Sequence, residues 1–513
     1  MSKVLENYWS FLILYSFFFI AVFSYLGLPA FWDEVWVYLP SVEYLHNNEI
    51  NLLPNSLPPE LSRGHPLFFH SLYGMWAKLL GLSLLKLRLL SLIITGFILL
   101  YTFKISKDFF GIKPGILVTT LVAIQPIIFI QSTQILPEIL VSLLSIIVIY
   151  SFLYEKRNLY IIAASCLLLT KESGIILIFS ITTFFIINSL EKKYFSFNAI
   201  LIILIPFLFP IIFFTIQYST YDWVFFPEHI SMLDFSINNL LQKYYLLHDF
   251  TFEKSGRLVL FWGAAISVAL FWKHGSIWKN GLSFVLFSTL LKVLFGYWVP
   301  IEYLIIPISL LLIIVLYFQW YKKWKPENPK IKSFFLLSTI FAIFYLAFSS
   351  VNFFTFRYLL AIIPIIIISQ FILIYSESKY PNLAFIIVAL SIGVTFYKYN
   401  SDTKIFDVNT NYKDGLVIKQ KLVNYIEDNI KDDECVSCGF LDNYIFKSQL
   451  AGHRRNARII RTENYNSNNY CKYLIFTNFD DKIDSSIIKD QYIQVYSIDN
   501  GNAKGVVLKR TSK

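Results

Sequence analysis

A few charged side chains stand beside long apolar runs, and they are the residues of this sequence best suited to chemistry. Asp33 and Glu34 lie in the stretch FWDEVWVYLP, directly after a long run without charged residues. An ionised carboxylate next to hydrocarbon is costly unless it lines a watery cavity or meets a cation. The ordinary alternative is that both acids are solvated residues of a loop.

Other charges interrupt apolar segments in the same way. Glu138, in QSTQILPEIL, is the only charged residue between Pro114 and Tyr154, and Lys171 with Glu172 divides the apolar stretch LLLTKESGIILI. Charges at membrane depth usually have a function. The ordinary alternatives are an acid favoured by the helix dipole for Glu138, and a mutually neutralising pair for Lys171 and Glu172.

Cations accompany these acids. Arg357 is the lone charge in FFTFRYLLAIIP, and RGHPLFFH adds Arg63 and His65. A carboxylate can take the proton of a hydroxyl acceptor while cations hold a phosphate leaving group. Acids and cations at a membrane surface therefore indicate transfer from a phosphate-linked lipid donor to a hydroxyl. The neighbouring aromatics Trp32 and Trp36 suit a sugar face and a lipid headgroup layer equally well.

The elements that must position these residues are membrane helices. Of the 513 residues, 56% are hydrophobic and 15% are charged, which is too apolar for an ordinary soluble protein. Apolar runs long enough to cross a bilayer recur up to about residue 397. We predict a polytopic α-helical membrane protein with about thirteen spans, near residues 9–29, 87–106, 114–133, 136–154, 158–170, 174–190, 197–217, 257–272, 279–297, 301–320, 333–350, 357–376 and 382–398.

The distribution of basic residues predicts the orientation. Lys and Arg cluster in alternate short loops, and the positive-inside rule makes those loops and the N-terminus cytoplasmic. The net charge of +10 is thus explained without nucleic acid. The first apolar run is predicted to be a span rather than a signal peptide, because no small-x-small cleavage site follows it. The predicted location is the plasma (inner) membrane, with the C-terminal part outside.

Composition also divides the chain. The patches SVEYLHNN and PLFFHSLYGMWAKLLG in the long first outer loop predict helices lying at the interface. We predict a transmembrane domain over residues 1–398 and a small C-terminal extracytoplasmic α/β domain over residues 399–513. In the latter, GLVIKQKLVNYIEDNI has helical spacing, CVSCGF and KYLIFTNF predict buried strands, and YIQVYSI with GVVLKR predicts a terminal hairpin. One disulfide is expected among Cys435, Cys438 and Cys471, with its pairing open.

Several chemistries lack their sequence signals. There is no G-x-x-x-x-G-K-[ST] loop, no G-x-G-x-x-G fingerprint and no H-E-x-x-H helix, so nothing indicates nucleotide hydrolysis, dinucleotide binding or zinc-protease chemistry. A zinc site built on CVSC would need Cys471 and His453 at no recognised spacing.

In motif order, residues 9–376 resemble the polyprenyl-phosphate-sugar-dependent glycosyltransferases of the C-type fold, which include the protein O-mannosyltransferases and the aminoarabinose transferases of lipid A. FWDEVWVYLP resembles the aromatic-Asp-Glu motif of that family, which implies that Asp33 is the catalytic base and Glu34 its helper. RGHPLFFH resembles the loop motif whose basic residue meets the donor phosphate, which implies that role for His65. Leu67 replaces the second proline of the family motif.

The resemblance continues along the chain. LLGLSLLKLRLLSL is similar to the Arg-Leu entry of the second span, with Arg88. LLLTKESG and FRYLLAIIP resemble motifs that imply donor-phosphate contacts for Lys171 and Arg357. Glu138 stands where the family has a second acid, usually Asp, which implies an acceptor or structural site. Gly64 replaces the acid on which the zinc of some members depends, so we predict no zinc site of that kind. No cofactor is predicted, and a divalent cation stays an open alternative.

Together these features predict an inverting glycosyltransferase, a hexosyl- or pentosyltransferase. It would move a sugar from a polyprenyl-phosphate carrier to a hydroxyl of a protein, lipid or surface glycan on the external face of the membrane. Its partners would be that donor, the acceptor and the bilayer. Two alternatives remain: a flippase or transporter of lipid-linked saccharides, and a non-catalytic glycan-assembly protein. No repeat relates the two halves, which favours a one-sided site over a transporter.

Overall fold

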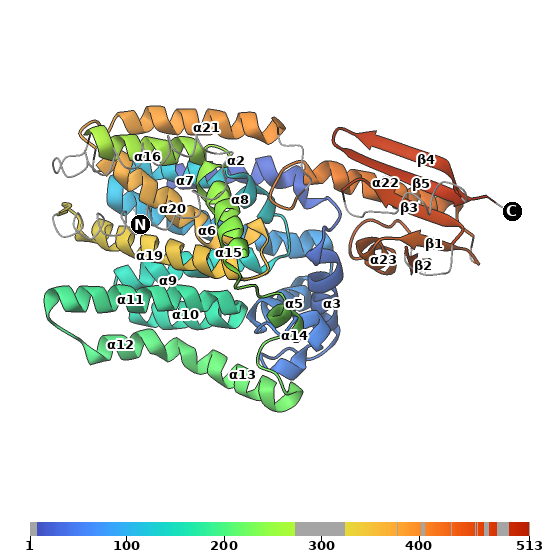
Figure 1. The fold of residues 1–513 in the computed structure, drawn as a ribbon, viewed down its shortest axis with the longest axis horizontal. Coiled ribbons are helices and arrows are strands. Elements are labelled where there is room, and N and C mark those ends of the chain that lie inside the picture. The colour runs from blue at the N-terminus through green and yellow to red at the C-terminus, as the bar shows by residue number, and fades with distance from the viewer. Residues whose placement is uncertain are drawn as a thin grey trace.

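The chain folds into a helical bundle with a small sheet domain at one end (Figure 1). The computed structural model describes residues 8–271, 324–376, 378–401, 406–431, 433–456, 458, 460–465, 471–479 and 492–511. Figure 1 shows the strands gathered at the end of the molecule that carries the C-terminus, beyond the short blue helices α3 and α5. The predicted fold class, a polytopic helical membrane protein with a C-terminal α/β domain, is confirmed.

Five of the described helices are long and apolar enough to cross a membrane by themselves. They are α2 (Trp9–Leu26), α6 (Leu84–Phe110), the segment Glu172–Lys192 containing α11 (Ile175–Lys192), the segment Phe197–Tyr221 containing α12 (Phe197–Leu204) and α13 (Leu208–Tyr221), and α19 (Pro329–Val351). The described residues also form shorter apolar helices: α7 (Ile112–Ala123), α9 (Pro137–Leu153), α10 (Arg157–Thr170), α16 (Arg257–Phe271), α20 (Ile363–Phe371) and α21 (Leu383–Ser401). The spans expected at 279–297 and 301–320 lie outside the described residues, so the count of thirteen stays a prediction.

Three of the expected spans are divided. The range 197–217 consists of α12 and α13 joined by the 3₁₀ turn η4 (Ile205–Phe207). The range 114–133 breaks before Pro126, where α8 (Pro126–Gln131) begins, because proline cannot continue the hydrogen-bond ladder of α7. The range 357–376 begins as the 3₁₀ helix η6 (Phe356–Ala361), continues as α20 and ends as the π-helix η7 (Ile372–Ser376). The tighter and wider turns set the side chains of η6 and η7 at different angles from those of α20.

The first loop holds short helices, as its amphipathic patches predict. They are η1 (Glu34–Tyr38), α3 (Leu39–Asn47), η2 (Pro54–Ser56), α4 (Pro59–Ser62) and α5 (Phe68–Leu80). In α5, Phe69 and Tyr73 are buried while Leu79 is exposed, so one side of this helix packs inward. The second long loop holds α14 (Pro227–Ser231), α15 (Ile237–His248) and η5 (Asp249–Glu253).

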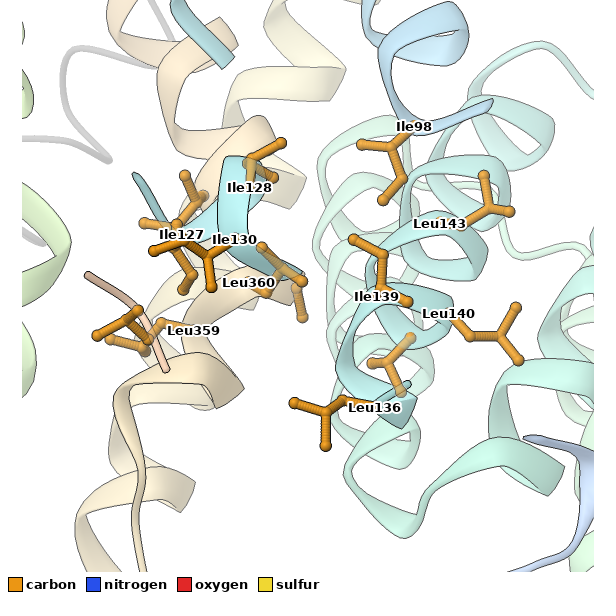
Figure 2. Packing of buried hydrophobic residues seen from close by; sticks show 14 of the residues in the cluster. Ile98, Ile127, Ile128, Ile130, Leu136, Ile139, Leu140, Leu143, Leu359 and Leu360 are labelled. Carbon is orange, nitrogen blue, oxygen red and sulfur yellow. The ribbon is translucent and has the colours of Figure 1, made fainter. Parts of the chain in front are cut away.

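In the core, η6 packs against both α8 and α9. Figure 2 shows Leu359 and Leu360 of η6 facing Ile127 and Ile130 of α8, with Leu136 and its neighbours across the gap. The hydroxyl of Ser142 in α9 also donates to the carbonyl of Leu360, at 3.0 Å. Aliphatic packing on both sides therefore fixes the backbone that carries Arg357.

The C-terminal domain is a five-stranded mixed sheet covered by α22 (Tyr412–Asn429). The strand order is β2-β1-β3-β5-β4, with β1 parallel to β2 and β3, and β5 antiparallel to β3 and β4. The bounds are β1 (Cys435–Cys438), α23 (Phe440–Lys447), β2 (Arg461–Asn464), β3 (Tyr473–Thr477), β4 (Tyr492–Asn500) and β5 (Ala503–Arg510). Gly505 lets α22 approach β5, since a Cβ there would lie 2.6 Å from Leu422.

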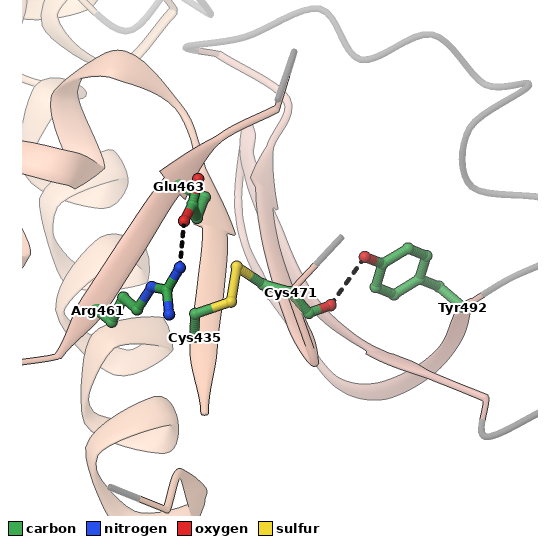
Figure 3. Close-up of a disulfide and its surroundings, with 5 residues drawn as sticks. All are labelled: Cys435, Arg461, Glu463, Cys471 and Tyr492. Atoms are coloured by element: carbon green, nitrogen blue, oxygen red, sulfur yellow. Dashed lines mark hydrogen bonds and ion pairs between the residues drawn. A yellow bond between two sulfur atoms is a disulfide. The ribbon is translucent and has the colours of Figure 1, made fainter. Parts of the chain in front are cut away.

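The disulfide joins Cys435 to Cys471, while Cys438 is a buried free thiol. Figure 3 shows it linking the start of β1 to Cys471, two residues before β3, with the hydroxyl of Tyr492 donating to the carbonyl of Cys471. The helix, the strands β1 and β3 and the terminal hairpin lie where the sequence predicts them. The sequence does not predict α23 and β2, which have short, mixed-polarity sequences.

Candidate functional site

Asp33 lies in a strained turn directly before η1. Trp32, just before it, has a φ of 43°, a left-handed conformation that is uncommon for a bulky residue. The Asp33 carboxylate accepts a hydrogen bond of 2.9 Å from Trp36 Nε1 with one oxygen and forms an ion pair with Arg357 through the other. The turn thus places this carboxylate next to Arg357, which lies near the end of the predicted transmembrane domain in the sequence.

The C-terminal domain braces the same turn. The amide of Ala30 donates to the carbonyl of Ala451 at 2.8 Å, and the carbonyl of Ala30 accepts from His453 Nε2 at 2.7 Å. The ring of Trp36 packs against Phe440 of α23, with centroids 5.3 Å apart. The backbone before Asp33 and the side chain that hydrogen-bonds to it therefore both contact the sheet domain.

Glu138 meets both cations of the cluster. It lies in the first turn of α9, after Pro137, where the helix dipole favours an acid. Its Oε1 accepts a 2.8 Å hydrogen bond from Lys171 Nζ, and its Oε2 lies 3.8 Å from Arg357 Nε. The ordinary expectation of a helix-start acid is met, and the same carboxylate also pairs with two residues from distant elements.

Lys171 comes from the apex of a helix pair. It caps α10 in an extended conformation and is followed by the 3₁₀ turn η3 (Glu172–Gly174) before α11. Gly174 permits the turn, because a Cβ there would lie 2.7 Å from Leu167. The ammonium group of Lys171 also lies 3.8 Å from the ring centroid of Tyr358. Lys171 therefore pairs with Glu138 rather than with its neighbour Glu172.

Glu172 pairs with His65 instead. The carboxylate lies 2.7 Å from His65 Nδ1, and both side chains are partly buried. Before His65, Arg63 and Gly64 both take left-handed conformations, with φ of 54° and 71°. A Cβ at Gly64 would lie 2.9 Å from Phe226, so glycine is needed where the second long loop covers this turn. His65 thus lies beside the Lys171 cluster through the adjoining Glu172.

Arg63 links the two long loops. It pairs with Glu228 at 2.6 Å and lies over the rings of Phe226 and Trp36, at 4.7 and 5.2 Å from their centroids. Because Trp36 also donates to Asp33, these contacts connect the second loop to the Asp33 turn. Glu228 is more than half exposed, so its ion pair adds little stability by itself.

Glu34 is not brought into the cluster. It is fully buried and pairs with the equally buried Arg88 at 3.1 Å. Its oxygens also accept from the amides of Phe31 at 3.0 Å and Ile135 at 2.9 Å. With its acceptors engaged by Arg88 and two amides, Glu34 ties the Asp33 turn to α6 and to the segment before α9. The adjacent acids of FWDEVWVYLP therefore face different partners.

Asp407 also belongs to the cluster, although the sequence did not predict it as a site residue. It follows α21 in the segment that leads to the C-terminal domain, and its Oδ2 lies 2.5 Å from Arg357 Nη1. Gln131 donates to its backbone carbonyl at 2.9 Å. The only available signal was its position shortly after the last apolar run, because no spacing relates KIFDVNT to the other motifs.

The cluster therefore combines three carboxylates with two cations. Arg357 lies among Asp33, Glu138 and Asp407, and Lys171 pairs with Glu138. The described residues contain no group of three His, Cys, Asp or Glu that could hold a metal ion. The arrangement can accept a proton at a carboxylate and hold an anion at the cations.

Two clefts adjoin the segment that carries Asp407. An apolar cleft of about 410 Å³ lies among α2, α7 and α21, and a polar cleft of about 220 Å³ lies next to it. Tyr399 and Thr410 line both of them. The segment after α21 thus contacts the cluster through Asp407 and the clefts through Thr410.

Comparison with known proteins gives a likeness to solved structures alone. No family model matches the sequence, and no curated protein matches it. The chain is similar to ArnT from Cupriavidus metallidurans in a crystal structure bound to undecaprenyl phosphate, with 11% identity, a TM-score of 0.46 and 98% of each chain covered. It is also similar to the apo crystal structure of ArnT, with 12% identity, a TM-score of 0.47 and 97% of each chain covered.

Proposed function

We propose that this chain is an inverting glycosyltransferase that takes a sugar from a polyprenyl-phosphate carrier and gives it to a hydroxyl acceptor. The observation that carries the proposal is the single cluster of Asp33, Glu138, Lys171 and Arg357, which come from four separate parts of the sequence. Apolar helices account for a lipid carrier, and the cluster supplies a base and phosphate-binding cations. The kind of donor is the one that the sequence motifs imply.

In the proposed reaction, Asp33 takes the proton of the acceptor hydroxyl. The acceptor oxygen attacks the anomeric carbon while the bond from that carbon to the phosphate oxygen breaks on the opposite face. The phosphate leaves with the bonding electrons, and Lys171 and Arg357 hold its charge. One displacement inverts the configuration of the sugar. Trp36 orients the base through its hydrogen bond, and Glu138 orients both cations.

Several other residues have supporting roles in this proposal. His65 would add a third contact to the phosphate side, because its partner Glu172 adjoins Lys171. Glu34, which the motif resemblance makes a helper in catalysis, would be a positioning residue that holds the Asp33 turn through Arg88. The external face of the membrane and the outer position of the C-terminal domain belong to the proposal as well, with a domain boundary near residue 398.

The Asp33→Asn variant tests the proposal. Membranes that contain the protein would receive a radiolabelled polyprenyl-phosphate sugar, and release of sugar-free polyprenyl phosphate would be measured together with labelled acceptor. We expect a loss of about 100- to 10,000-fold, the usual contribution of a general base. Glu60→Gln, which removes an exposed acid from the same loop, should keep normal transfer.

Two outcomes would contradict the proposal. Undiminished transfer by a normally inserted Asp33→Asn protein would exclude this residue as the base. Movement of the intact lipid-linked sugar across the membrane, without release of polyprenyl phosphate by the wild-type protein, would favour a flippase instead.

A further inference from the structure

Both terminal nitrogens of the Arg357 guanidinium contact a carboxylate within the described part of the chain, and its Nε is buried without a hydrogen-bond partner there. Its Nη2 contacts Asp33, its Nη1 lies 2.5 Å from Asp407, and its Nε faces Glu138 at 3.8 Å. Arginine recognises a phosphate best with two parallel N–H groups of its planar fork. A donor phosphate can therefore use that fork only if one of these carboxylates gives way.

The charge balance points in the same direction. Asp33, Glu138 and Asp407 carry one negative charge more than Lys171 and Arg357 can neutralise. The neighbouring ion pairs, His65 with Glu172 and Arg88 with Glu34, add no net positive charge that could attract an anion. Another negative charge brought into this buried cluster would meet repulsion that water screens poorly.

Asp407 is the carboxylate that can most readily withdraw. Asp33 is fixed by Trp36 and by a turn that the sheet domain braces, and Glu138 is fixed in the first turn of α9 by Lys171. Asp407 lies outside any helix or strand, on the segment whose Thr410 lines two clefts. Gln131 holds its backbone carbonyl, so the movement proposed is a rotation of its side chain away from Arg357.

The surroundings of Asp407 also weaken its hold on a negative charge. Burial raises the pKa of its carboxyl, and the nearby carboxylates of Asp33 and Glu138 act in the same direction, against the opposing effect of Arg357. The ionised form of Asp407 is therefore disfavoured by its surroundings, and an arriving anion would disfavour it further.

We propose that Asp407 is a stand-in for the donor phosphate: it occupies Nη1 of Arg357 while the site is empty and withdraws when the phosphate binds. Residues 406–411, which lead into α22, would then be part of the donor site and would set donor affinity. This inference rests on the proposed function, since it assumes that Arg357 receives a lipid phosphate.

Binding of polyprenyl phosphate to the purified full-length protein tests the inference. Native mass spectrometry or calorimetry would compare the wild-type protein with Asp407→Asn, which keeps the shape of the side chain and removes its charge. We expect the variant to bind about tenfold more tightly, because the phosphate no longer competes with a carboxylate. Arg357→Ala should lose binding, and Asp428→Asn, which removes an exposed acid of α22, should bind like the wild-type protein.

Kinetics give an independent readout. In Asp407→Asn and Asp407→Ala the KM for the lipid-linked donor should fall while kcat does not rise, a split that a merely structural role would not produce. Equal or weaker binding of polyprenyl phosphate by both folded variants, with normal binding by the wild-type protein, would overturn the inference and leave the proposed function standing. Failure of the wild-type protein and of both variants to bind polyprenyl phosphate would overturn both.

Discussion

Arg357 and Asp33 form an ion pair although 324 positions separate them in the sequence. The same guanidinium contacts Asp407, so one side chain connects the first loop with the segment after the last described membrane helix. This central place makes the planar fork of arginine important, since an ammonium group cannot reproduce its fixed geometry.

Arg357→Lys should therefore impair transfer although it keeps the positive charge. Loss of one charge-assisted hydrogen bond costs about 1.5–3 kcal/mol, which corresponds to roughly 10- to 100-fold in kcat/KM for the donor. Steady-state kinetics with a lipid-linked sugar would measure this loss in kcat/KM. Arg157→Lys, on the exposed start of α10, is the matched control, and an equal loss in both variants would refute a special role for Arg357.

The contribution of Lys171 to folding stability should be separable from its contribution to donor binding. Lys171→Met leaves Glu138 buried beside only the distant Nε of Arg357, and breaking such a pair costs about 3–5 kcal/mol. The double variant Lys171→Met with Glu138→Gln should recover most of that stability but not donor use. Thermal melting in detergent and donor KM would be measured on both.

The matched control for this pair lies in the C-terminal domain. Lys419 and Asp442 form a similarly buried pair at 2.6 Å, and the double variant Lys419→Met with Asp442→Asn should keep donor use. If the Lys171 and Glu138 double variant used donor as well as this control did, a role for Lys171 at the donor phosphate would be excluded.

Glu34→Gln should differ from Asp33→Asn despite their adjacency. It leaves Arg88 buried without its carboxylate partner, and we expect a loss of about 3 kcal/mol in the free energy of unfolding. Turnover per folded molecule, measured at low temperature, should fall less than tenfold because Glu34 contacts no cluster cation. A normal melting temperature combined with a hundredfold loss of turnover would instead make Glu34 a catalytic residue.

His453 should make the stability of the protein depend on pH. Burial lowers its pKa from 6.5 to about 3, so it is neutral in the folded protein, with Nε2 donating to Ala30. The unfolded chain binds the extra proton, and stability therefore falls as pH decreases below about 6.5. The slope is about 1.4 kcal/mol for each pH unit and each such histidine.

Two other histidines contribute to this slope. Burial also lowers the pKa of His70 to about 3 and that of His229 to about 4. His453→Gln keeps a donor for Ala30 and cannot titrate, so it should reduce the dependence of melting temperature on pH between 6.5 and 5 by about a third. An unchanged slope would show that His453 also becomes protonated in the folded protein.

Local patterns in the sequence were enough to predict most of the elements. Long apolar runs and the change to polar sequence after Tyr397 act locally, because hydropathy does not depend on distant partners. They located the long apolar helices of the described residues, the short helices α3 and α5 of the first loop and most of the C-terminal sheet, but not the break at Pro126 or the elements α23 and β2. The same local signals singled out Asp33, Glu138, Lys171 and Arg357 as charges in costly places.

Which of these charges meet depends on the packing of distant helices. The tertiary structure paired Lys171 with Glu138 rather than with Glu172, turned Glu34 away from Asp33 toward Arg88, and added Asp407 to the cluster. Neighbours in sequence point in different directions when a turn or a change of helix type intervenes, as at Trp32 and at the apex between α10 and α11. The partner of each charged side chain then depends on how whole helices pack together, and no local sequence pattern encodes that packing.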